Sequence, residues 1–100
     1  MCYHLKTQYG NTEAVIDDNC SVSKFYAIAE TLSSELHVNF LNQVDDVDTL
    51  NWDFKYKNQV LTLHYHVFKG VSVFPQHAKS FLRENNAVLE IASFLERRAY

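Results

Sequence analysis

The sequence predicts an α+β domain in which two main helices cover an antiparallel sheet, made of an N-terminal hairpin plus a three-stranded meander. Composition supports one packed core: the 100 residues are 47% apolar and include only two Gly and one Pro, which excludes collagen-like, linker-like and disordered chains. Hydrophobic periodicity changes along the chain in the order strands, helix, strands, helix. No repeat, low-complexity segment or linker interrupts it, so we expect a single domain over residues 1–100.

The first third of the chain predicts a hairpin and then a helix. Apolar and polar residues alternate over residues 3–9, Gly10-Asn11 is typical of a tight turn, and residues 13–16 return as a short strand. The spacing of apolar residues then changes to that of a helix over residues 23–36, with Ser21 or Ser23 as its N-cap. The apolar positions of this helix are Val22, Phe25, Ile28, Ala29, Leu32 and Leu36.

The middle of the chain predicts strands joined by short turns. Residues 38–44 have the composition of a strand, and residues 45–51 are expected to be a polar, acidic loop. Strands over 52–57, 61–67 and 71–74, with turns at 58–59 and 69–70, form the meander, and Pro75 ends it. Trp52, Phe54 and Tyr56 are expected to pair with Leu61, Leu63 and Tyr65, and Val67 completes the buried face of its strand.

The helical period returns at residue 78 and continues to the last turn, where Arg97-Arg98 complements the helix dipole. Asn85-Asn86 is a weak point in this helix, because Asn side chains compete for backbone hydrogen bonds.

Charge is divided unevenly along the chain. Residues 1–53 hold nine acidic and two basic residues, whereas residues 54–100 hold three acidic and seven basic ones. A negative surface attracts a basic protein and repels nucleic acid, and the longest basic run is only Arg97-Arg98, so we expect no nucleic-acid partner. No stretch approaches the roughly 20 apolar residues of a membrane helix, and the N-terminus does not resemble a signal peptide. We therefore expect no membrane partner, a cytoplasmic location, and free thiols at Cys2 and Cys20.

An acidic window next to a tryptophan is the strongest candidate for partner binding. Like charges clustered in a loop are costly unless a cation or a basic surface uses them. The window lacks the Gly and the distal Glu of a calcium loop, and paired carboxylates would need a cleft to act in catalysis. A merely solvated loop remains the alternative. The predicted partner-binding residues are Asp45, Asp46, Asp48, Trp52 and Asp53.

His64 and His66 lie on one side of a predicted strand and could begin a metal site. No further ligand stands at a diagnostic spacing, so we expect two histidines on the solvent face, with no metal and no cofactor. The chain also has no G-x-S-x-G, no C-x-x-C and no Gly-rich phosphate loop, and we therefore assign no catalytic residue and expect no enzyme. A small metal-dependent or acid–base enzyme using these histidines is the third-ranked alternative.

The stretches 45–56, 61–65 and 70–75 resemble small bacterial immunity proteins, which partner the toxins of contact-dependent growth inhibition and related polymorphic toxin systems. The likeness lies in size, acidity and strand style, and it carries no residue-by-residue correspondence. It implies a non-enzymatic cytoplasmic antitoxin that binds and blocks one cognate basic toxin domain, often a nuclease. The second-ranked reading is a small regulatory or structural domain that acts through homodimerisation or another protein partner.

Overall fold

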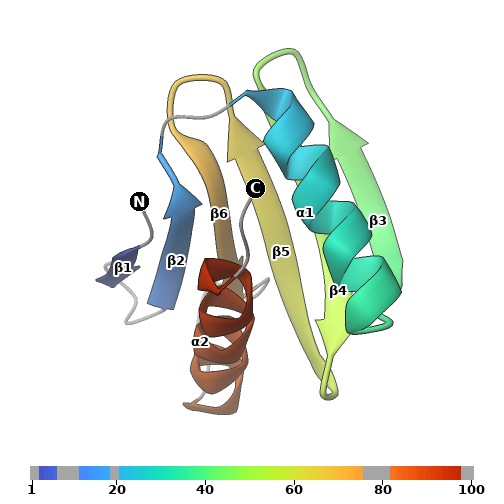
Figure 1. Ribbon diagram of the computed structural model, residues 1–100, viewed down its shortest axis with the longest axis vertical. Coiled ribbons are helices and arrows are strands. Elements are labelled where there is room, and N and C mark those ends of the chain that lie inside the picture. Colours follow the sequence, from blue (N-terminus) through green and yellow to red (C-terminus); the bar gives the residue numbers. More distant parts are fainter. Residues whose placement is uncertain (1–2, 7–11, 19–20, 76–81, 98–100) are drawn as a thin grey trace.

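The computed structural model describes residues 3–6, 12–18, 21–75 and 82–97, which form six strands and two helices (Figure 1). In chain order these are β1 (Tyr3–Lys6), β2 (Thr12–Asp17), α1 (Val22–Glu35), β3 (Phe40–Asp45), β4 (Thr49–Tyr56), β5 (Gln59–His66), β6 (Gly70–Pro75) and α2 (Leu82–Glu96). The predicted turn at Gly10-Asn11, the start of the second helix at residues 78–81, Arg98 and both cysteines lie outside the described residues.

The six strands form one antiparallel sheet in the order β1-β2-β6-β5-β4-β3. Strands β3 to β6 follow one another as a meander, and β2 then pairs with β6 rather than with a sequence neighbour on that side. The sheet therefore has two edges, β1 and β3, which lie at opposite sides of the molecule in Figure 1.

The predicted fold, an α+β domain built from a hairpin plus a three-stranded meander beneath two main helices, is wrong. All six strands belong to a single continuous sheet, and the meander has four strands because β3 pairs with β4. Residues 45–51 were expected to be a loop, but β3 runs to Asp45 and β4 starts at Thr49. Polar residues are tolerated here because β3 is an edge strand whose side chains from Leu41 to Asp45 are exposed to solvent.

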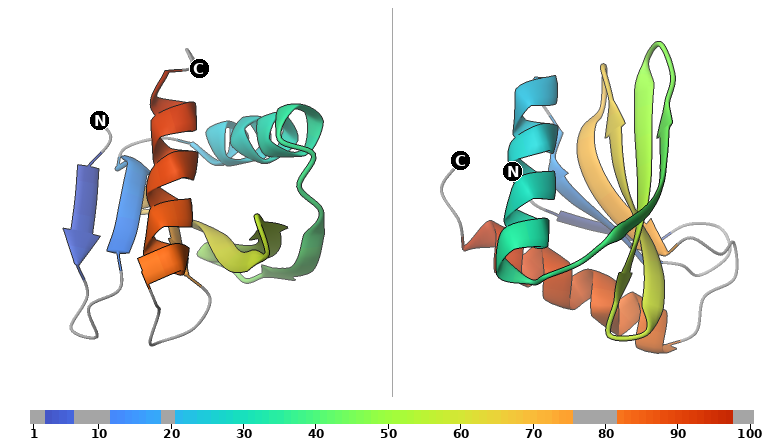
Figure 2. Two further views of the ribbon diagram at one scale, coloured as in Figure 1. Left: turned by 90° about the horizontal axis from the view of Figure 1, so that it is seen from below. Right: turned by 90° about the vertical axis from the view of Figure 1, so that its right-hand side faces the viewer.

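Both helices cover the same face of the sheet, and the right-hand view of Figure 2 shows them together on one side. Helix α2 packs on β2, β6 and β5, and α1 contacts β5 and β6. Between helices and sheet lies one core whose largest fully buried side chains are Phe25, Phe54, Ile28, Leu32, Leu61, Leu63, Ile91 and Leu95. We call the other side of the sheet, which carries no described helix, the open face.

Two turns depend on unusual backbone conformations. Lys57 and Asn58 both have positive φ, 49° and 65°, as a two-residue type I′ hairpin requires, so the turn lies one residue earlier than expected. Gly70 has φ 77° at the start of β6, and a Cβ there would lie 1.8 Å from the backbone oxygen of Asp17. Only glycine fits this position, where β6 approaches the end of β2.

The helix bounds, the N-cap and the pairing of strands agree in part with those predicted from the sequence. Helix α1 starts one residue before the expected position and ends one residue before Leu36. Ser21 occupies the N-cap position, but its hydroxyl lies 2.7 Å from the Ser23 hydroxyl and makes no side-chain cap bond. The predicted pairing of β4 with β5 is confirmed, with Trp52 opposite Leu63 and Phe54 opposite Leu61. Helix α2 continues through Asn85-Asn86 without a break.

Truncation of Leu63 tests the packing of the central strand. Its side chain is fully buried, so Leu63→Ala should lower the free energy of unfolding by about 2–5 kcal/mol through lost burial and the cavity that remains. Urea unfolding followed by circular dichroism measures this change. Leu89→Ala is the control, because Leu89 is 37% exposed on α2 and its truncation should cost well under half of that. Equal losses for the two variants would contradict this packing.

Candidate functional site

Three segments meet at one end of the sheet: the start of α1, the β3–β4 turn and the β5–β6 turn (Figure 1). The amide of Asp46 donates to the backbone oxygen of Thr49 at 2.8 Å and closes the β3–β4 turn. The amide of Val67 donates to the backbone oxygen of Asp48 at 3.0 Å and joins the β5–β6 turn to it. Backbone hydrogen bonds thus hold the two turns side by side.

A hollow of about 280 Å³ opens between these segments. Its lining residues are Val22, Asp46, Val47, Asp48, Thr49, Leu50, Tyr65 and Val67. Val47 is fully exposed, while Val67 and Val22 are 47% and 41% exposed. Exposed apolar side chains therefore lie directly beside two exposed carboxylates, and no Lys or Arg lines this hollow. We call Val22, Asp46, Val47, Asp48 and Val67 the acidic end.

Of the predicted binding residues, Asp46 and Asp48 lie in the acidic end. Asp45 is adjacent, and its Oδ1 accepts a hydrogen bond from Trp52 Nε1 at 2.8 Å. Trp52 is half-buried under α1, with its ring centroid 5.0 Å from that of Phe25 and 5.7 Å from that of Tyr26. The indole therefore holds α1 against the sheet instead of standing free as an interface anchor.

Asp53 lies apart from the other predicted residues. It follows Trp52 directly, so the pleat of β4 directs its side chain to the open face. There its Oδ1 accepts a hydrogen bond from Thr62 Oγ1 at 2.6 Å. The structure brings Asp45, Asp46 and Asp48 together and separates Asp53 from them, which the sequence window alone does not reveal.

Sequence reasoning missed the apolar part of the acidic end. Val67 was predicted to be buried in its strand, but β5 ends at His66 and Val67 starts the turn. Phe68, next in the turn, is 84% exposed. The signal that could have found them is the position of two consecutive apolar residues just before Lys69-Gly70, where a turn was already expected.

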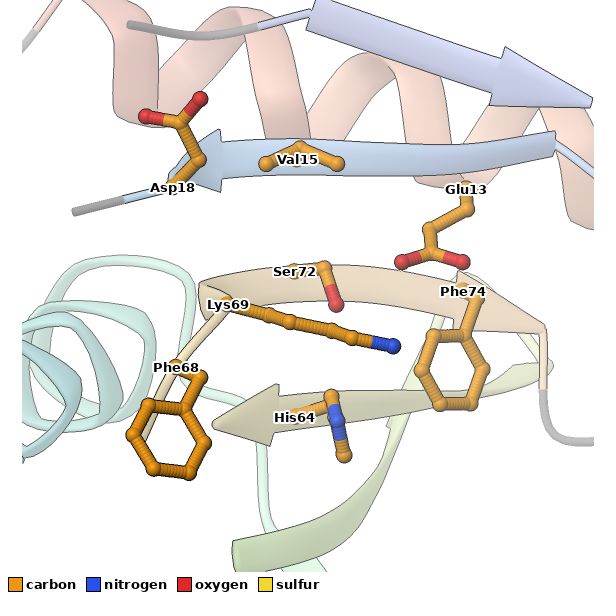
Figure 3. A pocket seen from close by; sticks show the side chains of 8 residues that line it. All are labelled: Glu13, Val15, Asp18, His64, Phe68, Lys69, Ser72 and Phe74. Atoms are coloured by element: carbon orange, nitrogen blue, oxygen red, sulfur yellow. The ribbon is translucent and has the colours of Figure 1, made fainter. Parts of the chain in front are cut away.

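The open face carries a second hollow, of about 640 Å³ (Figure 3). Its lining residues are Glu13, Val15, Asp18, His64, Phe68, Lys69, Ser72 and Phe74. In Figure 3 the Lys69 side chain extends between Ser72 and His64, and Glu13 reaches from β2 toward Phe74, whereas the Asp18 carboxylate points away. The hollow thus brings acidic, basic and aromatic groups from β2, β5 and β6 together.

His64 is the best-defined polar group of this hollow. Its Nδ1 lies 2.7 Å from Asn51 Oδ1, and since an amide oxygen only accepts, Nδ1 carries the proton and Nε2 is the free acceptor. Burial lowers the pKa of His64 below its ordinary value of 6.5, and electrostatic interaction with the neighbouring His66 and Lys69 side chains lowers the pKa further. The Phe74 ring, with centroids 5.6 Å apart, packs against the neutral imidazole.

The two strand histidines make separate contacts. His64 bonds to Asn51, whereas Nδ1 of His66 accepts a hydrogen bond from the amide of Phe68 at 3.0 Å. Among the described residues, no group of three or more His, Cys, Asp or Glu lies where it could hold a metal ion. In the same part of the chain, no helix is both long and apolar enough to cross a membrane.

Comparison with known proteins gives a family but no activity. The family described as "Protein of unknown function (DUF3630)" matches residues 3–73. The chain belongs to this family. In this DUF3630 chain the matched region runs from β1 into β6, and it includes the whole acidic end and all but Phe74 of the open-face hollow. No curated protein and no solved structure matches the chain.

The lowered pKa of His64 predicts acid sensitivity of this DUF3630 chain. Below pH 6.5 the unfolded chain binds a proton at this position before the folded chain does, so stability is lost as the pH falls from 6.5 through the lower folded pKa. Urea unfolding between about pH 8 and about pH 5 should therefore show a smaller loss for His64→Gln than for the wild type.

His37→Asn is the control for this experiment. It removes a histidine that is exposed to solvent and sits at φ 57°, a conformation that asparagine also tolerates. This variant should keep the acid sensitivity of the wild type. The same pH dependence in His64→Gln as in the wild type would mean that the His64 ring does not carry the effect.

Proposed function

We propose that the chain is a non-enzymatic protein-binding module whose contact surface is the acidic end. The observation that supports this is the juxtaposition of exposed Val22, Val47 and Val67 with the exposed carboxylates of Asp46 and Asp48. Protein interfaces commonly join an apolar centre, which supplies affinity, to a charged rim, which selects the partner. Two backbone hydrogen bonds hold this surface, so little ordering is needed when a partner binds.

The partner in this proposal is a basic protein. Complementary charge speeds the encounter between two proteins and disfavours wrong partners. A lysine or arginine of the partner would lie beside Asp46 and Asp48, and an apolar side chain would enter the hollow between the two turns and α1. The same carboxylates would repel nucleic-acid phosphates and anionic lipid headgroups, which supports a protein partner over nucleic acid or a membrane.

In its specific form, the proposal is an immunity protein that neutralises a cognate toxin domain in the bacterial cytoplasm. Nuclease toxins approach phosphates and therefore present basic clefts, which the acidic end could enter. The resemblance of size, acidity and strand style to such immunity proteins supports this form, while the charge and exposure of the acidic end support the general one.

The double variant Asp46→Asn, Asp48→Asn tests the proposal. It removes both exposed charges of the acidic end but keeps Asp45, whose carboxylate holds Trp52. Binding to the product of the neighbouring gene, measured by surface plasmon resonance, should show an association rate lowered by about tenfold at low salt. The difference from the wild type should shrink at high salt, because screening already weakens the attraction.

The matched control is Glu30→Gln, Glu96→Gln. It removes the same number of charges from exposed positions on α1 and α2 and should leave the association rate close to that of the wild type. Unchanged rates for the acidic-end variant, or equal decreases for both double variants, would refute a specific role of this surface.

A further inference from the structure

Strand β3 forms one edge of the sheet, and no described strand pairs with its outer side. The right-hand view of Figure 2 looks onto this edge. Its residues from Leu41 to Asp45 are all exposed, and Leu41 and Val44 are each 53% exposed. The strand holds no Lys, Arg or Pro, residues with which proteins commonly prevent an edge from pairing, and its bulge lies before Asn42, outside the segment from Asn42 to Asp45. The edge is therefore open to a further strand.

The hydrogen bonds of the β3–β4 hairpin determine which backbone groups point outward. Asp46 donates to Thr49, so the 46–49 pair is hydrogen-bonded. Bonded and non-bonded pairs alternate in an antiparallel ladder, which makes Val44 and Asn51 a bonded pair. Gln43 and Asp45 are then in non-bonded pairs, and their amides and carbonyls point away from β4 toward the free edge. On β4, the bond from Val67 to Asp48 gives the same alternation.

We propose that β3 pairs antiparallel with β3 of a second copy of this chain, with the two-fold axis at Val44. In this register Gln43 of each copy lies opposite Asp45 of the other copy. Both residues present an outward amide and carbonyl, so the two pairs form four backbone hydrogen bonds between the copies. The two sheets join into one continuous sheet, and each copy uses the same surface, as a two-fold dimer requires.

The side chains are also self-complementary in this register. Gln43 faces Asp45 of the second copy, and Asn42 faces its Asp46, so each carboxylate meets an amide donor and no two acids lie directly opposite. Val44, exposed in one chain, faces Val44 of the other at the non-bonded position, where side chains are closest. The pairs match in face as well, because Gln43 and Asp45 lie on one side of β3 and Val44 on the other.

The ends of the paired segment extend this match. Leu41 stands at the bulge of β3, and in the same register its position faces Val47 of the second copy. Two exposed apolar positions thus meet at each end of the contact. A register centred on Gln43 would instead place Asn42 opposite Val44 and Leu41 opposite Asp45, which pairs apolar with polar side chains. The Val44-centred register therefore has the better complementarity.

This dimer does not rest on the proposed function, and the effect of salt on association distinguishes the two proposals. Two copies that each carry a formal charge of −3 repel one another, so screening should strengthen the dimer, whereas it weakens binding to a basic partner. Asp46 and Val47 belong to both surfaces, and for that reason the test uses Val44, which belongs to the edge alone.

Analytical ultracentrifugation of the whole chain up to about 1 mM tests the inference. The wild type should reach the mass of two chains at high concentration. Val44→Lys and Val44→Glu should each lower the association constant at least about tenfold, because like charges then face one another across the axis. An equimolar mixture of these two variants should recover association, because opposite charges then meet. The control Leu89→Lys changes an exposed apolar residue on α2 and should associate like the wild type.

Amide hydrogen exchange tests the register itself. The amides of Gln43 and Asp45 should exchange several-fold more slowly at high than at low chain concentration, whereas the Val44 amide, bonded within the chain, should not change. Should a charged variant fail to fold by circular dichroism, Gln43→Pro replaces it, since it removes only an outward amide. A wild type that stays monomeric up to about 1 mM overturns the inference. So does a mixture of the charged variants that fails to associate.

Discussion

A row of side chains across the sheet determines the arrangement of everything else. Ala14 lies opposite Val73, Val73 opposite Leu63, and Leu63 opposite Trp52, so the row spans β2, β6, β5 and β4 on the helix-covered face. Ala14, Val73 and Leu63 are fully buried. Because side chains alternate with a period of two, a slip of one residue in any of these strands would move its apolar set to the open face. Burial under α1 and α2 thus sets the register of the whole sheet.

The same alternation produces the polar row of the open face. Ser72 lies opposite His64, His64 opposite Asn51, and Asn51 opposite Val44. With no described helix over this side, these positions need not be apolar, and the hydrogen bond to Asn51 satisfies Nδ1 of the half-buried His64 ring. The row ends at Val44 on the exposed edge. The registers that bury the core therefore also determine which backbone amides and carbonyls of β3 point outward.

The acidic and basic halves of the sequence do not form separate acidic and basic sides of the folded molecule. Acidic residues 1–53 supply β1 to β3, most of β4 and α1, and the basic remainder supplies β5, β6 and α2. The sheet places β6 beside β2 and β5 beside β4, so the two halves are interleaved. Only a local cluster of negative charge remains in the fold. Asp46 and Asp48 stay together because a tight turn between adjacent strands holds them. Charge can therefore direct a partner to one end of the molecule without giving the whole fold two oppositely charged sides.

The sequence by itself determined the elements whose pattern is local. The 3.6-residue spacing located α1 within a residue, and the period of two identified β4 and β5 as antiparallel neighbours. The turn expected at residues 58–59 nevertheless implied a register two residues away from the observed one. Only the tertiary structure decided that β2 pairs with β6, that β3 joins the meander, and that Val67 is exposed while Trp52 is packed under α1. These outcomes depend on which distant strand offers free backbone groups and which face the helices cover. Such competition between remote segments leaves no periodic signal in a single sequence, because it is settled by burial of the whole core.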